Sequence, residues 1–159
     1  PWSRRLRYRA GDGLAALEPA DRIDTVVLAG VGGRTIVRIL SAPPALPRRL
    51  VLQPRTEERA LRRWLSERGL VPVAETLTEE RGRQHLTLAA EPGPDEELYR
   101  YPGLTRDDLL AAGPLLVRAG SETLRRRWAA EADRWKTLRP EGPELRRAER
   151  VLAAISRRA

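Results

Sequence analysis

Several residue types are missing from this 159-residue chain, and each gap removes a class of chemistry. There is no cysteine, which excludes disulfides, cysteine nucleophiles and thiolate metal sites. His85 is the only histidine, so a histidine metal cluster and a catalytic triad with a second histidine are also excluded. The chain has no methionine and begins with Pro1, and we therefore expect it to be the later part of a longer protein.

Long apolar runs are missing as well. No stretch reaches the roughly 20 apolar residues that a membrane-spanning helix needs. A secretory signal would show a positively charged segment followed by an apolar one, and the sequence has no such pattern. We therefore expect a cytoplasmic protein with no membrane partner and no bound metal. The length fits one main domain with its own hydrophobic core, together with a small appendage.

Positive charge is abundant, with 30 lysines and arginines against 22 acidic residues, a net charge of +8. The sequence pI of about 11.1 favours a polyanionic partner, and nucleic acid is the usual candidate. However, Lys136 is the only lysine, and asparagine and phenylalanine are absent. A GC-rich genome gives this composition to any soluble surface, so the charge is compatible with RNA binding without demonstrating it.

One stretch, from Asp24 to Gly33, organises the rest of the chain. Thr25 to Ala29 is a continuous apolar run, which predicts a parallel strand covered on both faces, and a helix from Arg34 to Leu40 follows. Ligands of open α/β sheets bind where such strands end. The glycines between strand and helix would admit a flat ligand, and the amides at the helix start would donate to it. A simple tight turn explains the same glycines, because GxGG lacks the full GxGxxG spacing.

A second candidate site residue is Asp12, in the turn from Gly11 to Leu14. The alternation from Arg4 to Arg9 predicts a strand before this turn, which would place Asp12 at a strand's carboxyl end. A carboxylate there accepts hydrogen bonds from an exocyclic amine or a hydroxyl of a ligand. The alternative is a turn aspartate that bonds to its own backbone.

The middle of the chain continues the α/β pattern and then changes. A third strand is predicted from Leu50 to Pro54, and a helix from an N-cap at Thr56 to Arg68. Two further strands, Val71 to Thr78 and Gln84 to Ala90, read as an antiparallel hairpin. The glycines and prolines that follow mark a linker. The predicted division is therefore an α/β unit at residues 1–91, a linker at 92–103 and a helical hairpin unit at 104–159.

The last third of the chain is helical. Thr105 to Asp108 has a capping-box pattern, and Gly113-Pro114 interrupts the helix that follows. Apolar residues then recur at steps of three and four on both sides of a turn at Pro140 to Pro143, which predicts a coiled-coil-like antiparallel pair. The seam is predicted to comprise Leu124, Trp128, Trp135, Leu138, Leu145, Ala148, Leu152 and Ile155.

Arginines flank this predicted seam and are expected to project mostly outward. They are a solvated helix face on one interpretation and a stripe that contacts the RNA backbone on the other. The candidate RNA-binding residues among them are Arg125, Arg126, Arg127, Arg146, Arg147 and Arg150.

The order of the short motifs resembles one family. Gly11-Asp12-Gly13-Leu14, Ala29 to Gly33, Leu52-Gln53-Pro54, Gly113-Pro114 and Arg127-Trp128 with Glu131 follow one another. This order is similar to that in the bacterial tRNA (adenine-N1)-methyltransferases that modify the adenine at position 22 of tRNA, which carry GDGL, AGMGG, LQPN and a late GP…KW…E pattern. The sequence departs from that pattern at Val31 for Met, at Arg55 for Asn, and at His85-Leu86, where Tyr-Glu is common.

The resemblance implies a partial class I, Rossmann-like methyltransferase sheet that uses S-adenosylmethionine (SAM) and acts on tRNA. It also implies that the first glycine-rich SAM motif and the acidic residue for the ribose precede Pro1. By the resemblance, Ala29 and Gly30 lie at the reacting groups, and Gln53 and Arg55 lie on the RNA side. The residues implied to bind the cofactor are Gly11, Asp12, Gly13, Gly30, Val31 and Gly32.

Two functions from different classes follow from the sequence. The first is SAM-dependent methyl transfer to N1 of an adenine in tRNA. The second is a non-catalytic RNA-binding or assembly module that kept the sheet edge and the hairpin without the SAM-binding half. We also expect self-association through the strand predicted from Arg4 to Arg9, because an unpaired strand edge recruits other strands.

Overall fold

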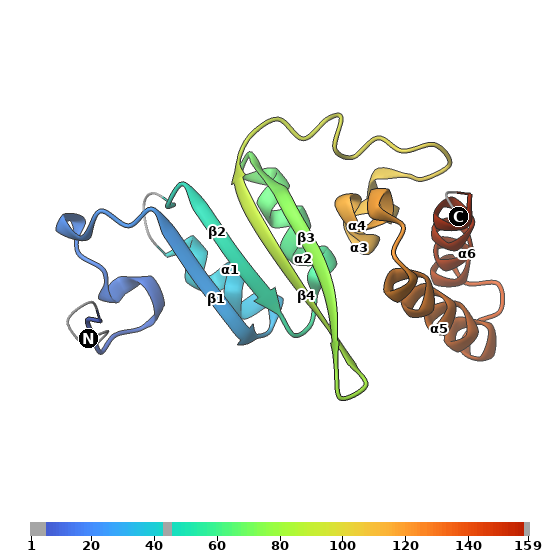
Figure 1. The fold of residues 1–159 in the computed structure, drawn as a ribbon, viewed down its shortest axis with the longest axis horizontal. Helices are drawn as coiled ribbons and strands as arrows, with labels where there is room; N and C mark the ends of the chain where they lie inside the picture. The colour runs from blue at the N-terminus through green and yellow to red at the C-terminus, as the bar shows by residue number, and fades with distance from the viewer. Residues whose placement is uncertain (1–5, 43–45, 158–159) are drawn as a thin grey trace.

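The computed structural model describes residues 6–42 and 46–157 (Figure 1). A mixed α/β part comes first and a helical part follows, joined by a long connection after the last strand. The elements of the first part are η2 (Gly13–Ala16), η3 (Pro19–Asp21), β1 (Thr25–Val31), α1 (Gly33–Ser41), β2 (Arg49–Pro54), α2 (Glu58–Glu67), β3 (Leu70–Glu80) and β4 (Arg83–Pro92). The second part contains α3 (Arg106–Ala112), α4 (Pro114–Ala119), α5 (Glu122–Leu138) and α6 (Pro143–Ser156).

The four strands form one sheet in the order β1-β2-β4-β3. β1 pairs with β2 in parallel, whereas β4 is antiparallel to both β2 and β3. The predicted hairpin is confirmed, and it turns through only two residues, Arg81 and Gly82, both with positive φ (50° and 74°). Positive φ at both central positions matches the right-handed twist of the strands and lets them continue to the turn. The hairpin is therefore longer than the sequence pattern predicted.

Helices α1 and α2 supply the core beneath this sheet. Ile36 and Leu40 on α1, and Leu61 and Leu65 on α2, are at most 1% exposed. They belong to the same buried cluster as Leu50, Leu52, Leu86 and Leu88 of the strands. The amphipathic patterns that predicted both helices therefore correspond to real buried faces.

Strand β1 does not have the environment that its apolar run predicted. The prediction of a strand covered on both faces is wrong for the described residues, because Val26 is 6% exposed and Val27 is 65% exposed. Both α1 and α2 lie on the same side of the sheet (Figure 1). β1 is also an edge strand, since among the described strands it pairs only with β2.

The prediction of a strand from Arg4 to Arg9 is also wrong for the described residues. Arg4 and Arg5 lie outside the described residues, and residues 6–10 have no regular structure. Leu6 and Tyr8 are 57% and 90% exposed, so their alternation meets no apolar surface. A strand needs a partner for its backbone groups, and none of the described strands pairs with this segment. The unpaired edge expected here belongs to β1 instead.

The helical part begins as predicted. Thr105 Oγ1 accepts a hydrogen bond from the Asp108 amide (3.1 Å), and the Asp108 carboxylate accepts one from the Thr105 amide (3.0 Å). This reciprocal pair is the capping box of α3. Gly113, with φ at +92°, separates α3 from α4.

Helices α5 and α6 pack against each other, but the seam differs from the predicted one. Leu124, Trp128, Leu145 and Ala148 are buried as expected. In contrast, Leu138 is 58% exposed, and Val151 is fully buried where Leu152 was expected. The reason is that α6 also contacts α3 and α4, so its buried face is wider than a two-helix seam. Across the described residues, no helix has both the length and the apolar character to cross a membrane.

Candidate functional site

The glycine turn after β1 has an open side. Gly30 interrupts the register between β1 and β2, because Ala29 pairs with Gln53 and Val31 pairs with Pro54. Its φ is +77°, and a Cβ built on it would meet no atom within 4 Å. Glycine adopts such a bulge at little cost and leaves the backbone accessible. This turn therefore offers exposed backbone at the carboxyl end of a parallel strand, where α/β sheets bind ligands.

The start of α1, in contrast, is already occupied. The Gly33 amide donates to the carbonyl of Thr56 (3.0 Å), and the Arg34 amide donates to the Glu57 carboxylate (3.2 Å). A Cβ on Gly33 would lie 2.9 Å from the carbonyl oxygens of Thr56 and Glu57. The prediction that the amides at the helix start donate to a ligand is therefore wrong for these two amides. Gly33 instead permits close packing of two turns of the chain.

Glu57 is a site residue that the sequence pattern did not reveal. Its carboxylate also pairs with the Arg34 side chain at 2.5 Å. A negative charge at the N-terminus of α1 interacts favourably with the positive end of the helix dipole. The backbone of Glu57 is left-handed, with φ at 62°, which is unfavourable for a residue with a side chain. The structure also corrects the N-cap of α2 from Thr56 to Glu57.

Asp12 lies away from this turn. Gly13 packs against Ile39 near the end of α1, where a Cβ on Gly13 would lie 3.0 Å from Ile39. Ile39 follows Gly33 by six residues, or about 9 Å along the helix axis. The Asp12 carboxylate is 82% exposed and lies 3.6 Å from Arg38 Nη1. The structure therefore leaves this carboxylate accessible but does not bring it to the end of a strand.

The predicted RNA-side residues Gln53 and Arg55 lie close to the glycine turn. Gln53 pairs with Ala29 across the sheet, and the Arg55 amide donates to the carbonyl of Val31 (2.9 Å). The Arg55 side chain lines a cavity of about 250 Å³ that also reaches α3 and α5. The other lining residues are Thr56, Glu57, Glu58, Arg59, Ala111, Arg127, Trp128 and Glu131. The late motif around Trp128 is therefore brought next to the turn that follows β2.

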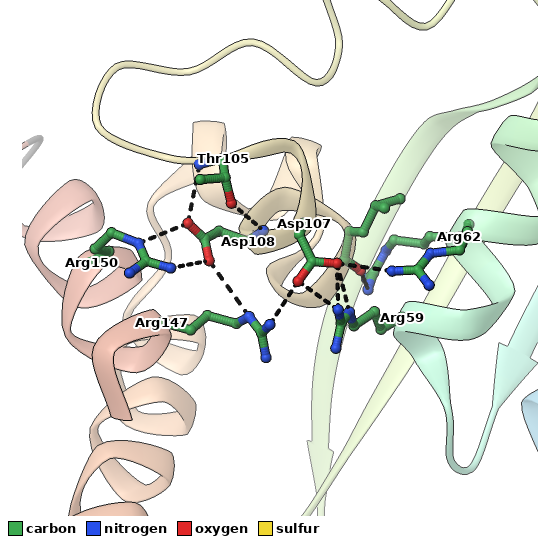
Figure 2. A network of polar contacts seen from close by, with 9 residues as sticks. Arg59, Arg62, Thr105, Asp107, Asp108, Arg147 and Arg150 are labelled. Carbon is green, nitrogen blue, oxygen red and sulfur yellow. Dashed lines mark hydrogen bonds and ion pairs between the residues drawn. The ribbon is translucent and has the colours of Figure 1, made fainter. Parts of the chain in front are cut away.

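A polar network joins the two parts of the molecule through α3 (Figure 2). Asp107 pairs with Arg59 and Arg63 of α2 and with Arg147 of α6 (2.6 Å). Asp108 accepts two hydrogen bonds from Arg150, at 2.8 and 2.9 Å. The side chain of Arg147 is only 18% exposed, so the prediction that it projects outward is wrong. Arg150 is likewise held by a carboxylate, because α6 packs on α3.

The carboxylates of this network have lowered pKa values. Burial alone raises the pKa of Asp108, but the hydrogen bonds from Arg150 and from Thr105 outweigh it and hold the pKa below its ordinary value. For Asp107, burial acts in the same direction and is outweighed by Arg59 and Arg147. Both side chains therefore stay charged in the folded protein at neutral pH.

A fully buried ion pair lies beside this network. Arg62 Nε is 2.6 Å from Glu75 Oε1, and neither side chain is exposed. Arg62 Nη1 also donates to the carbonyl of Leu110 (3.1 Å), and the other Glu75 oxygen accepts from the Leu115 amide (3.0 Å). A Cβ on Gly113 would lie within 3 Å of both side chains, which explains the glycine there. We refer to this pair and the Asp107 and Asp108 network together as the junction.

The remaining predicted RNA-binding arginines have partners nearer the surface. Arg125 pairs with Glu122 (3.0 Å), Arg126 with Glu79 (3.2 Å) and Arg127 with Glu58 (2.9 Å). Arg146 donates to the backbone carbonyl of Glu141. Their contact with RNA stays a prediction.

Comparison with known proteins places these features in a family. A family model for tRNA (adenine(22)-N(1))-methyltransferases, TrmK, matches residues 2–156. The tRNA (adenine(22)-N(1))-methyltransferase of Bacillus subtilis is 28% identical over 136 residues, which cover 84% of this chain and 56% of that protein. The chain thus spans about half the length of the curated relatives it matches.

Solved structures agree with this match. A Streptococcus pneumoniae protein proposed to be a tRNA (m1A22) methyltransferase has 30% sequence identity and a TM-score of 0.72, over 92% of this chain and 66% of that one. The same protein in complex with SAM gives 31% identity and a TM-score of 0.71, over 92% and 65%. The mixed sheet and its helices therefore form part of a Rossmann-like methyltransferase fold. With its motifs, its fold and its match to the family model, the chain belongs to the tRNA (adenine(22)-N(1))-methyltransferase family.

Proposed function

We propose that this chain carries out part of a SAM-dependent methyl transfer to N1 of an adenine in tRNA. Family membership over residues 2–156 supports the reaction class. The observation that carries the proposal is the open glycine bulge at Gly30, at the carboxyl end of β1. The net charge of +8 is consistent with a nucleic-acid substrate.

The residues of this chain fit the two ends of SAM unequally. Exposed backbone at Gly30 suits the methyl end and a flat base, because no side chain fills the space beside it. The accessible carboxylate of Asp12 suits an exocyclic amine of the adenine end. Gly11, Gly13, Val31 and Gly32 would complete these two contacts. We assign no residue to the ribose or the methionine group.

The main task of the protein in this reaction is to position the two reactants. When bound, SAM supplies a methyl group that is already activated, and adenine N1 has a free lone pair. Ala29 and Gly30 would hold the base in line, with a backbone carbonyl accepting from its N6 amino group. The same carbonyl favours the positive charge that develops on the base. N1 must first be unpaired, because a base pair covers it.

A first test is SAM binding by this chain alone, measured by calorimetry. With only the adenine-end and methyl-end contacts, we expect a dissociation constant weaker than about 10 µM, or roughly 7 kcal/mol of binding free energy. Tighter binding would mean that the cofactor contacts are assigned wrongly. If weak binding is measurable, Asp12→Ala should weaken it further, and an unchanged affinity would identify Asp12 as a turn residue only.

The decisive test is methyl transfer from labelled SAM to a tRNA transcript. The protein should be translated from the whole open reading frame that encodes this chain. We expect label on a transcript with adenine at position 22 and none on a transcript with guanine there. The second candidate is a non-catalytic RNA-binding module. It is supported by the finding that the chain covers only 56% of its Bacillus subtilis relative. RNA binding without methyl transfer would support that module and overturn the catalytic assignment.

Three further features belong to this proposal. We assign residues 1–91 to the methyltransferase unit, 92–103 to a linker and 104–159 to a coiled-coil-like hairpin that contacts tRNA through its arginines. We place the protein in the cytoplasm, where tRNA is modified. For this chain, self-association is proposed through the edge of β1 that pairs with none of the described strands, with its exposed Val27, in place of the segment from Arg4 to Arg9. A monodisperse monomer in light scattering at high concentration would contradict it.

A further inference from the structure

A groove separates the β3–β4 hairpin from helix α5. The hairpin extends well beyond the other strands (Figure 1), and Gln84 near its tip touches α5 by donating to the carbonyl of Thr123 (3.4 Å). The groove between them has a volume of about 480 Å³. Its residues on the hairpin are Glu79, Gly82 and Gln84, and those on α5 are Arg126, Arg127, Ala130, Glu131 and Arg134.

This groove leads to the candidate site. Arg127 and Glu131 line both the groove and the 250 Å³ cavity beside Arg55, so the two spaces share a wall. The cavity is also lined by Thr56 and Glu57, which pack directly on the glycine turn. The groove and the cavity are therefore neighbours, and the cavity lies on the side of Thr56 and Glu57 that faces α5, next to the glycine turn.

The arginines along this path hold their partners weakly. Arg126 is 58% exposed and lies 3.2 Å from Glu79, which is 39% exposed. Arg134 is 62% exposed and lies 3.9 Å from Glu131, although it also covers the Trp135 ring. Exposed pairs of this kind contribute about 0–1 kcal/mol, so a phosphate can replace the carboxylate partner. The Arg55 side chain has no hydrogen-bond or ion-pair partner among residues 6–42 and 46–157.

We propose that this groove binds a single-stranded segment of the RNA substrate and guides it to the glycine turn. Arg126 and Arg134 contact its phosphates at the hairpin end, and Arg55 contacts the phosphate nearest the reacting base. The reacting adenine must be unpaired because N1 lies on its pairing edge, and a single-stranded segment presents N1 without the cost of opening a base pair. The contact between Gln84 and α5 bounds the groove at the hairpin end. This inference rests on the proposed function and names the part of the RNA that the site recognises.

The test compares binding of two RNA probes by fluorescence anisotropy. One probe is a stem with a single-stranded adenine-containing loop, and the other is a blunt duplex of equal length. The double substitution Arg126→Gln with Arg134→Gln should weaken binding of the loop probe about tenfold. It should also lower the salt slope of log K by about 1.4, at 0.7 per lost phosphate contact to a single strand. The control is Arg48→Gln, which removes one positive charge just before β2, at the end of that strand opposite to Arg55. It should alter the affinity for the loop probe less than about twofold.

A second variant is expected to increase the affinity for the loop probe instead of lowering it. Glu79→Gln releases Arg126 and removes a negative charge from the groove, so binding of the loop probe should tighten about threefold. A variant that gains affinity cannot owe its effect to misfolding. The matched control is Glu67→Gln, on the far end of α2, with no change expected. Equal effects of groove and control variants, or no gain with Glu79→Gln, would overturn the groove. If the groove results hold while methyl transfer to tRNA fails, only the proposed catalysis is wrong.

Discussion

The junction and the groove are both rich in arginine, yet the structure uses that residue differently in the two regions. At the junction, Arg62 is fully buried against Glu75, and Arg147 is 18% exposed between two aspartates. In the groove, Arg126 and Arg134 are 58% and 62% exposed beside single glutamates. The same side chain therefore fixes one part of the molecule to the other in the first region and stays free to change partner in the second.

Burial decides between these roles. An ion pair removed from water cannot be broken without leaving a charge uncompensated, so it holds its elements in one arrangement. An exposed pair exchanges with water or a ligand at little cost. The junction joins residues of α2, α3, α4, α6 and β3, and so it connects the sheet part of the molecule to the helical part.

The largest expected effect tests the junction. Arg62→Met leaves the buried Glu75 carboxylate without its guanidinium partner, and we expect a loss of about 3–5 kcal/mol of unfolding free energy. Urea denaturation followed by circular dichroism measures it. The double variant Arg62→Met with Glu75→Leu removes both charges and should lie within about 2 kcal/mol of the wild type. A single variant as stable as the double one would contradict the distinction between the two regions.

A smaller effect is expected at Asp108, through its pH dependence. Its folded pKa lies below its unfolded value of about 3.9, so its stabilisation is present above pH 4 and is lost as the pH falls through the folded pKa. Asp108→Asn should cost about 2 kcal/mol at pH 7. The difference between variant and wild type should shrink as the pH falls below about 4, through the lowered pKa of Asp108.

Denaturation midpoints of both proteins across this pH range provide the measurement. Asp133→Asn is the control, because that aspartate is 77% exposed and pairs with Lys136 only at 3.5 Å. A gap between Asp108→Asn and wild type that stays constant with pH would show that lost packing, and not lost charge, explains the variant.

Much of the fold could be predicted from the sequence, because local patterns specify it. The apolar run at Thr25, the amphipathic stripe of α2 and the capping box at Thr105 each depend on neighbouring residues. The predictions that proved wrong depend on residues that are distant in the sequence. The exposure of Val27 reflects which faces of the sheet the helices cover, and the shift from Leu152 to Val151 reflects a third packing partner of α6. No local pattern contains that information.

The candidate site divides in the same way. The place of Gly30 after an apolar strand predicts a turn that a ligand can approach, and the structure leaves space beside Gly30, while ligand binding there stays a prediction. Glu57, 24 residues further along the chain than Gly33, occupies the helix start that a ligand was expected to use. Arg147 is assigned to the surface because its charge is visible in the sequence, whereas Asp107, which pairs with it, lies 40 residues away.

The smallest expected effect on stability belongs to the groove. Arg126→Gln and Arg134→Gln should each change the unfolding free energy by less than about 0.5 kcal/mol, because both pairs are exposed to solvent and screened by salt. Urea denaturation at low and high salt measures this change, beside Arg150→Gln as a junction variant with the same substitution. Arg150→Gln should be clearly more destabilising, since it releases the 1%-exposed Asp108. Equal losses from Arg126→Gln and Arg150→Gln would mean that the groove arginines hold the fold together as the junction does, and a phosphate could not replace their partners without a loss of stability.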